Sequence, residues 1–198
     1  MANANRPTGL SPVRSILGAP FNGQAQLYSI AAAYSAAALY IGDPVISSGT
    51  SDANGIAGIT LAAATGPIRG VIVGIGTSPG LIANPSNLDI TYRPAAAQTD
   101  DWYAMVVDDP NMIFEVQEIG TGTALTAAEV GMNVNLVAGT GNGYVSGWQV
   151  SNSGEATTDT LQVRLLGLAQ RQDNAFGPYA KWLVKINNSE FYLGNAGL

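Results

Sequence analysis

Two side chains that serve much of enzyme chemistry, Cys and His, occur nowhere in the 198 residues. His has the ordinary pKa best suited to proton transfer near neutral pH and is the commonest metal ligand, and Cys supplies thiolate nucleophiles and zinc ligands. Only carboxylate, hydroxyl, Lys and Tyr chemistry is left. We therefore expect a protein that is not an enzyme and that uses no cofactor and no metal.

Positive charge is also scarce, because 8 Lys and Arg stand against 14 Asp and Glu and leave a net charge of −6. Such a chain repels phosphate backbones, so we expect no direct binding of nucleic acid. The charges are unevenly spread. From Met1 to Gly42 the only charged side chains are Arg6 and Arg14, whereas the stretch from Asp100 to Asp159 has nine acids and no Lys or Arg.

Long apolar runs are missing as well. The most apolar stretch, Ile30 to Ile41, is shorter than the roughly 20 residues that a bilayer span requires. The first 30 residues contain no continuous apolar run and no clear cleavage pattern of a signal peptide. We expect a soluble, unprocessed chain with no membrane partner.

Residues 1–22 are rich in Asn, Pro, Gly and Ser, and their prolines oppose a continuous helix or a central strand. We predict an extended N-terminal arm. One interpretation is a disordered terminus, and the other is an arm that becomes ordered on a neighbouring subunit. In the second interpretation the anchoring side chains are Arg6, Leu10, Val13, Arg14, Ile16, Leu17 and Phe21.

The remaining residues, 23–198, show short β-favouring runs separated by Gly-, Asp- and Asn-rich turns. The predicted strands are Gln26–Ile30, Leu39–Ile46, Gly58–Leu61, Ile68–Ile75, Leu88–Tyr92, Trp102–Val107, Met112–Glu118, Met132–Ala138, Tyr144–Val150, Leu161–Leu168 and Ala180–Asn187. This pattern predicts an all-β body, either a sandwich or a jelly-roll-like barrel. Helical periodicity is limited to Thr126–Glu129, which has the spacing of a capping box.

Three kinds of residue could support a binding or catalytic site. The Gly-rich segments 74–80 and 139–143 lack the spacing of nucleotide-binding loops and are interpreted as tight turns. The pairs Asp100-Asp101 and Asp108-Asp109 could bind a hard cation or exchange protons, but adjacent side chains diverge, so we interpret them as turn residues. Trp102, Trp148 and Trp182 could form a sugar-binding platform, although aromatic residues in β runs are usually core.

Several short sequence segments, here called phrases, are spread along the chain and resemble those of the capsid cement, or head decoration, proteins of tailed bacteriophages. The phrases are Arg6–Leu10 with Pro12–Arg14, Tyr28–Ala31, Tyr40–Val45, Asp108–Gln117, Val163–Leu168, Asp173-Asn174 with Gly177–Lys181, and Val184–Asn187. None of them is a catalytic motif. The chain departs from the family at Asn188-Ser189, where such proteins often have a histidine.

The resemblance implies a β-rich structural subunit on the outer surface of an assembled icosahedral head, made in the host cytoplasm. Its partners would be the major capsid protein and further copies of itself, as a homotrimer or, as the alternative, a dimer. The arm would hold neighbouring capsid subunits together while the acidic loops face outward.

Three other functions remain open from the residues alone. One is a carbohydrate-binding β module of a virion adhesin, based on the aromatic residues. Another is a different virion building block, such as a tail-tube or minor capsid subunit. The third is an enzyme, although no set of residues indicates a reaction.

Overall fold

The computed structural model describes residues 3–79 and 90–192 of the chain. Within these ranges the only helical element is a 3₁₀ turn, η2 (Ala127–Glu129), and the rest is short strands and loops. The strands are β1 (Ser11–Ser15), β2 (Gln26–Ile30), β3 (Leu39–Tyr40), β4 (Pro44–Ser51), β5 (Ala57–Leu61), β6 (Gly70–Gly76), β7 (Tyr92–Arg93), β8 (Trp102–Val107), β9 (Met112–Gln117), β10 (Asn133–Val134), β11 (Leu136–Val137), β12 (Gln149–Val150), β13 (Val163–Leu168) and β14 (Lys181–Ile186). The prediction of an all-β fold is confirmed.

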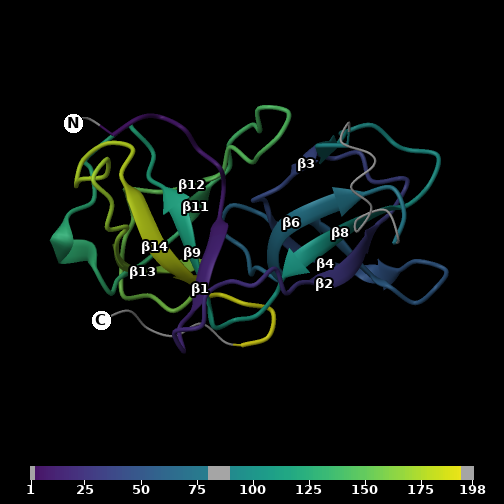
Figure 1. The fold of residues 1–198 in the computed structure, drawn as a ribbon, viewed down its shortest axis with the longest axis horizontal. Coiled ribbons are helices and arrows are strands. Elements are labelled where there is room, and N and C mark those ends of the chain that lie inside the picture. The colour runs from purple at the N-terminus through teal and green to yellow at the C-terminus, as the bar shows by residue number, and fades with distance from the viewer. Residues whose placement is uncertain (1–2, 80–89, 193–198) are drawn as a thin grey trace.

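The strands form two halves that lie side by side (Figure 1). One half is a closed barrel in the order β2-β5-β4-β6-β8, with the two-stranded sheet β3-β7 at one end. The other half is a five-stranded sheet in the order β1-β9-β14-β13-β10, accompanied by the pair β11-β12. Two connections join the halves: residues 16–25 lead from β1 to the first barrel strand, and residues 108–111 lead from the last barrel strand into the sheet.

The barrel closes because every one of its strands has a partner on both sides. All of its pairs are antiparallel except that between β2 and β5. The β4-β5 turn has the chemistry that its sequence predicts, since the Asp52 side chain accepts the N–H groups of Asn54 and Ile56. A small apolar cluster fills the interior of the barrel, with Ile30, Val45, Ile59 and Ile72 fully buried.

The larger apolar cluster joins the two halves. Phe114, Trp182 and Val184 on the inner face of the five-stranded sheet belong to the same cluster as Ile68 and Val71 from the barrel half. These side chains are completely buried. Because the cluster takes members from both halves, the halves share this core, and the barrel has its own smaller cluster in addition.

The backbones of three segments cross at the junction of the halves with almost no space between them. The Leu10 N–H donates to the Gly42 carbonyl at 3.0 Å, and the Ser146 N–H donates to the Ile41 carbonyl at 2.8 Å. Gly9 and Gly42 have φ values of 65° and 94°. A Cβ atom on Gly9 would collide with the Gly42 carbonyl, so both the backbone conformation and the close approach require glycine.

Residues 1–22 were predicted as an extended arm, and the described part, residues 3–22, is integrated into the sheet half. Residues Ser11–Ser15 form β1, the edge strand next to β9, with an irregularity in register between Pro12 and Arg14. An edge position and a bulge are where a strand tolerates proline. Residues 3–6 run along the sheet, where the Arg6 N–H donates to the Gln117 side chain at 2.9 Å.

Candidate functional site

The N-terminal segment forms a hairpin, residues 11–21, with an exposed apolar tip. The Ser15 N–H donates to the Ala19 carbonyl at 2.8 Å, and the Phe21 N–H donates to the Val13 carbonyl at 3.0 Å, so the returning chain pairs with β1. The Gly18 N–H closes the turn on the Ser15 carbonyl, and its φ of 96° is readily adopted by glycine. The outer edge of β1 is thus partly covered by its own hairpin.

The structure separates the seven predicted anchors into exposed and buried groups. Val13 is 40 % exposed, Ile16 is 49 % exposed and Leu17 is 86 % exposed, so these three apolar side chains lie together on the hairpin surface. Arg14 lies between them and is also exposed.

The other three anchors have different surroundings. Leu10 is only 1 % exposed and belongs to the large core, so its side chain is not available to a partner. Phe21 is half-buried against the same core. Arg6 is exposed, but it lies away from the hairpin turn on the segment that crosses the sheet.

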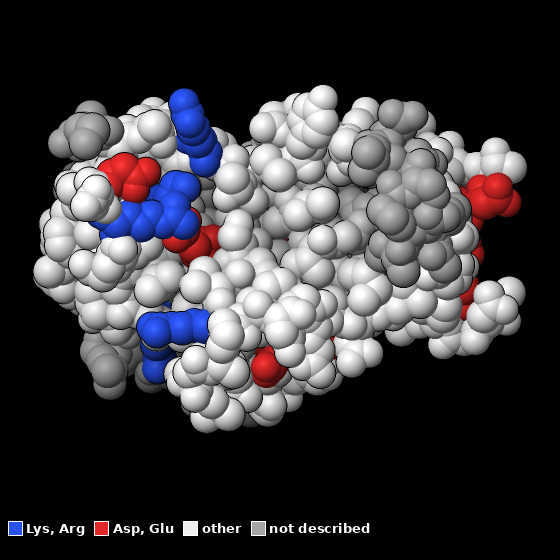
Figure 2. All heavy atoms as spheres, viewed as in Figure 1, with Lys and Arg blue, Asp and Glu red and all other residues white. Residues whose placement is uncertain are grey.

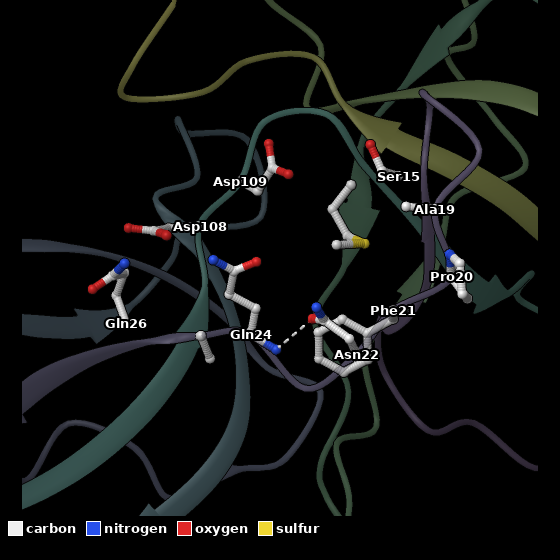
Figure 3. A pocket seen from close by; sticks show the side chains of 11 residues that line it. Ser15, Ala19, Pro20, Phe21, Asn22, Gln24, Gln26, Asp108 and Asp109 are labelled. Atoms are coloured by element: carbon white, nitrogen blue, oxygen red, sulfur yellow. Dashed lines mark hydrogen bonds between the residues drawn. The ribbon is translucent and has the colours of Figure 1, made fainter.

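A cavity of about 250 Å³ separates the hairpin from the connection between the barrel and the sheet. Figure 3 shows its lining, with Ser15, Ala19 and Pro20 on one side and Asp108 and Asp109 on the other. The lining contains both polar and apolar groups and no Lys, Arg, Tyr or Trp. The cavity is a gap under the hairpin, and its two carboxylates come from the connection between the barrel and the sheet.

The pair Asp108-Asp109 does not act as a unit. Asp108 Oδ2 accepts the Tyr28 hydroxyl at 2.6 Å and lies 4.0 Å from Arg69 Nε. Asp109 Oδ1 instead accepts the Asn111 N–H at 2.8 Å in the turn that starts β9. The interpretation of these residues as turn and structural groups is consistent with this geometry.

Arg69 is the centre of a polar cluster that fastens the C-terminal segment to the barrel. Its guanidinium carbon lies 4.0 Å from the centre of the Phe191 ring, and its Nε donates to the Tyr28 hydroxyl at 3.0 Å. Glu190 in the same segment accepts the Ser47 hydroxyl at 2.7 Å. Burial and the bond to Asp108 raise the pKa of Tyr28. The sequence did not indicate this cluster, because its members lie far apart in the chain.

Asp43 is a buried carboxyl group at the junction of the halves. It is 2 % exposed, and its Oδ2 accepts the Tyr40 N–H at 2.8 Å. Burial raises its pKa to about 6, although a hydrogen bond from Ser146 opposes the shift. It lines a cavity of about 310 Å³ together with Tyr40 and Trp148. The lining contains no other Asp or Glu and no Lys or Arg. The hydrogen bonds of this carboxyl group connect segments that meet at the junction of the halves.

Two further charged side chains are buried. Glu118 accepts the Trp182 indole N–H and the Leu125 N–H, both at 2.9 Å, and burial raises its pKa. Arg93 donates to the carbonyls of Pro94, Ala31 and Ala32 and lies over the Tyr34 ring. Both charged groups are thus hydrogen-bonded to backbone or indole groups within the chain.

The aromatic platform that a carbohydrate-binding module would need is not formed by the tryptophans. Trp148 and Trp182 lie in the large core, and Trp102 packs against the barrel cluster. The prediction that aromatic residues of the β runs are core is confirmed for Trp148 and Trp182, whereas Trp102 is only partly buried. Among residues 3–79 and 90–192, no group of three or more Asp or Glu side chains is placed to hold a metal ion.

The most unusual surface is a row of cationic side chains across the outer face of the five-stranded sheet, which the sequence did not reveal. Figure 2 shows Lys and Arg gathered over this half of the molecule, whereas acids alone mark the far end of the barrel. Alternation along β13 and β14 places Arg164 and Lys185 on one face, but their side-by-side position depends on the strand register.

Comparison with known proteins adds no relative to these observations. The chain matches no protein-family model, no curated protein and no solved structure. In the described parts of the chain, no helix is long and apolar enough to cross a membrane.

Proposed function

We propose that this chain is a structural subunit of a virion, a cement or decoration protein that binds the outer surface of a tailed-phage head and joins neighbouring major capsid subunits. It acts as a homo-oligomer, with a trimer favoured, and catalyses no reaction. The observation that best supports the proposal is the hairpin tip, where three apolar side chains are exposed on a turn that rests on a rigid sheet.

The hairpin has the properties of a docking element. An exposed apolar side chain such as Leu17 gains about 1.5–3 kcal/mol when it is buried by a partner. The strand before the turn is hydrogen-bonded to β9 and the return after it is hydrogen-bonded to β1, so little conformational entropy is lost when the tip docks. Repetition of one such contact around a symmetric oligomer multiplies a modest affinity.

The polar interior groups support a structural role. Each described buried carboxylate, Asp43 and Glu118, accepts backbone or side-chain donors within the chain. The rival function in carbohydrate binding is weakened, because Trp148 and Trp182, two of the three tryptophans of the possible sugar-binding platform, are buried in the core.

Substitution of Leu17 by Asp tests the proposal. We expect Leu17→Asp to weaken binding to phage heads assembled without this protein by about ten- to a hundredfold, which corresponds to the burial of one large apolar side chain. Co-sedimentation of labelled protein with the heads measures the affinity. Val137→Asp, at another exposed apolar position, is the matched control and should bind like the unmodified chain.

Substitution is preferable to deletion of residues 1–22. Deletion would remove Leu10 from the core and β1 from the sheet, and so confuse loss of folding with loss of binding. Absence of binding by the unmodified chain to any head preparation would refute the proposed function. Equal binding by Leu17→Asp would show that the hairpin is not the docking element.

A further inference from the structure

The outer face of the five-stranded sheet has three cations in one transverse row. Arg164 on β13 is paired directly with Lys185 on β14, Lys185 is paired with Ile113 on β9, and Ile113 is paired with Arg14 on β1. Directly opposed residues of neighbouring strands lie about 5 Å apart at Cβ. We call Arg164, Lys185 and Arg14 the cationic row.

The row faces away from the core. The residues that alternate with it along the strands, Leu165, Val184 and Phe114, are completely buried, so the row occupies the opposite face of the sheet. The pairing of Arg164 with Lys185 is unfavourable for the isolated chain, because like charges directly opposite each other destabilise a sheet. Neither Lys185 nor Arg14 has a carboxylate within 4.0 Å in the described chain.

The neighbouring cations differ in this respect. Arg171 and Lys181 lie 2.9 Å and 3.7 Å from Glu115, so their charge is compensated within the protein. The contrast shows that this face can place a carboxylate beside a cation. Lys185 and Arg14 therefore keep their positive charge without a carboxylate partner, on a chain whose net charge is −6, whereas Arg164 donates from Nε to the Asn133 side chain at 3.0 Å.

A hollow with an apolar rim lies beside the row. Its volume is about 590 Å³, and its lining includes Arg164, Lys185, Asn111, Phe191 and Tyr192. Both aromatic side chains are substantially exposed. Asn111 also contacts the hairpin, because its carbonyl accepts the Ile16 N–H at 2.8 Å, so the hairpin with the apolar tip lies next to the hollow.

We infer that the cationic row and this hollow bind an acidic polypeptide segment of the partner protein, with carboxylates on the row and apolar side chains on the rim. The inference rests on the proposed function, in which that partner is the major capsid protein. Charge complementarity selects the occupant, because an incoming carboxylate would supply the partner that Lys185 and Arg14 lack within 4.0 Å. The exposed aromatic rings of Phe191 and Tyr192 at the rim match the side chains of a polypeptide, whereas a phosphate polymer would meet the acidic remainder of the chain.

Charge reversal in the row tests the inference on phage heads that lack this protein. Lys185→Glu should bind at least about tenfold more weakly than the unmodified chain, since it replaces an attraction with a repulsion. Lys185→Gln should lose less, and its circular dichroism spectrum together with that of Lys185→Glu shows whether both are folded. The double substitution Ala95→Glu/Ala97→Glu is the matched control, because it changes the net charge equally at exposed positions of the barrel half, and it should bind normally.

The salt dependence provides a second measurement in the same assay. Binding of the unmodified chain should weaken as ionic strength rises from about 0.05 M to about 0.5 M, and binding of Lys185→Gln should weaken less. If Lys185→Glu binds as tightly as Ala95→Glu/Ala97→Glu, the inference is overturned while the proposed function stands, because Leu17→Asp reports on the latter.

If the unmodified chain binds no heads, the proposed function fails and poly-L-glutamate decides the inference. Chemical-shift changes in ¹⁵N–¹H spectra should then map to β13, β14 and the hairpin and disappear in Lys185→Glu. Absence of such changes would overturn the inference. Equal changes with dextran sulfate would also overturn it, because the row would then bind any polyanion without preference for a polypeptide.

Discussion

The barrel and the five-stranded sheet differ in whether they leave strand edges exposed. This difference indicates which half can present an interaction surface. The barrel has no edge, because β2 pairs with both β5 and β8. The sheet has two edges, and at one of them β1 is covered by its own return strand, which projects an apolar tip. Closure leaves the barrel little to offer a partner strand, whereas the open sheet presents a hairpin.

The two halves also differ in charge. The described cations of the barrel half are Arg93, which is buried, and Arg69, which is engaged with Tyr28 and Phe191. The charged side chains visible at the far end of the barrel are acidic, whereas Lys and Arg gather over the sheet half (Figure 2). This polarity would orient the molecule, with the sheet toward an acidic partner and the barrel away from it.

The largest effect that we predict tests whether the halves fold together. Trp182→Ala should lower the free energy of unfolding by about 3–5 kcal/mol, because it opens a cavity in the shared core. It also leaves Glu118 without its indole donor. Urea unfolding should show one transition by far-UV circular dichroism and by tryptophan fluorescence.

Leu17→Ala is the control for this prediction, since Leu17 is exposed in the free protein and the change should be within about 0.5 kcal/mol of zero. Two separate transitions in Trp182→Ala, with one half unaffected, would contradict a common core. The two halves would then be two separate domains.

The next effect concerns the junction and its dependence on pH. The pKa of Asp43 is raised by burial from 3.8 to about 6, so the folded protein holds this proton more tightly than the unfolded chain. Its contribution to stability is present below pH 4 and is lost as pH rises through 6, by about 3 kcal/mol for a shift of about two pKa units.

Asp43→Asn removes this loss, because an amide does not ionise. We expect the variant to gain stability relative to the unmodified chain as pH rises from 4 to 7.5, as measured by urea unfolding at each pH. Asp100→Asn, at an exposed carboxyl group of the barrel end, is the control. A stability difference between Asp43→Asn and the unmodified chain that does not change with pH would exclude the linkage.

Local patterns predicted much of this fold. The runs at Gln26–Ile30 and Trp102–Val107 coincide with β2 and β8. In such a run the flanking turn residues mark where the strand begins and ends. The capping box of Thr126 and Glu129 is present, with the Thr126 N–H bonded to the Glu129 carboxylate. Closure of the barrel and the separation of β8 from β9 into different halves depend on long-range pairing, which no local pattern encodes.

The candidate site was only partly predictable for the same reason. Strand β1 was missed, because three prolines in residues 1–22 outweighed its apolar residues, and an edge position accommodates Pro12. Val13, Ile16 and Leu17 were found from their apolar character in a polar segment. The cationic row brings together residues 14, 164 and 185, and only the register of four strands places them side by side.

The smallest predicted effect tests the polarity of the molecule directly. Asp100→Lys changes the net charge by two units just before β8 begins, at the end of that strand away from residues 108–111, which lead into the sheet. At physiological ionic strength, charges further apart than about 8 Å are largely screened, so we expect its binding to heads to change less than about twofold. Lys185→Glu makes a change of the same size in the row and should have a much larger effect. If both variants alter co-sedimentation to the same extent, total charge rather than the placement of charge governs binding, and the barrel end would have to belong to the interface as well.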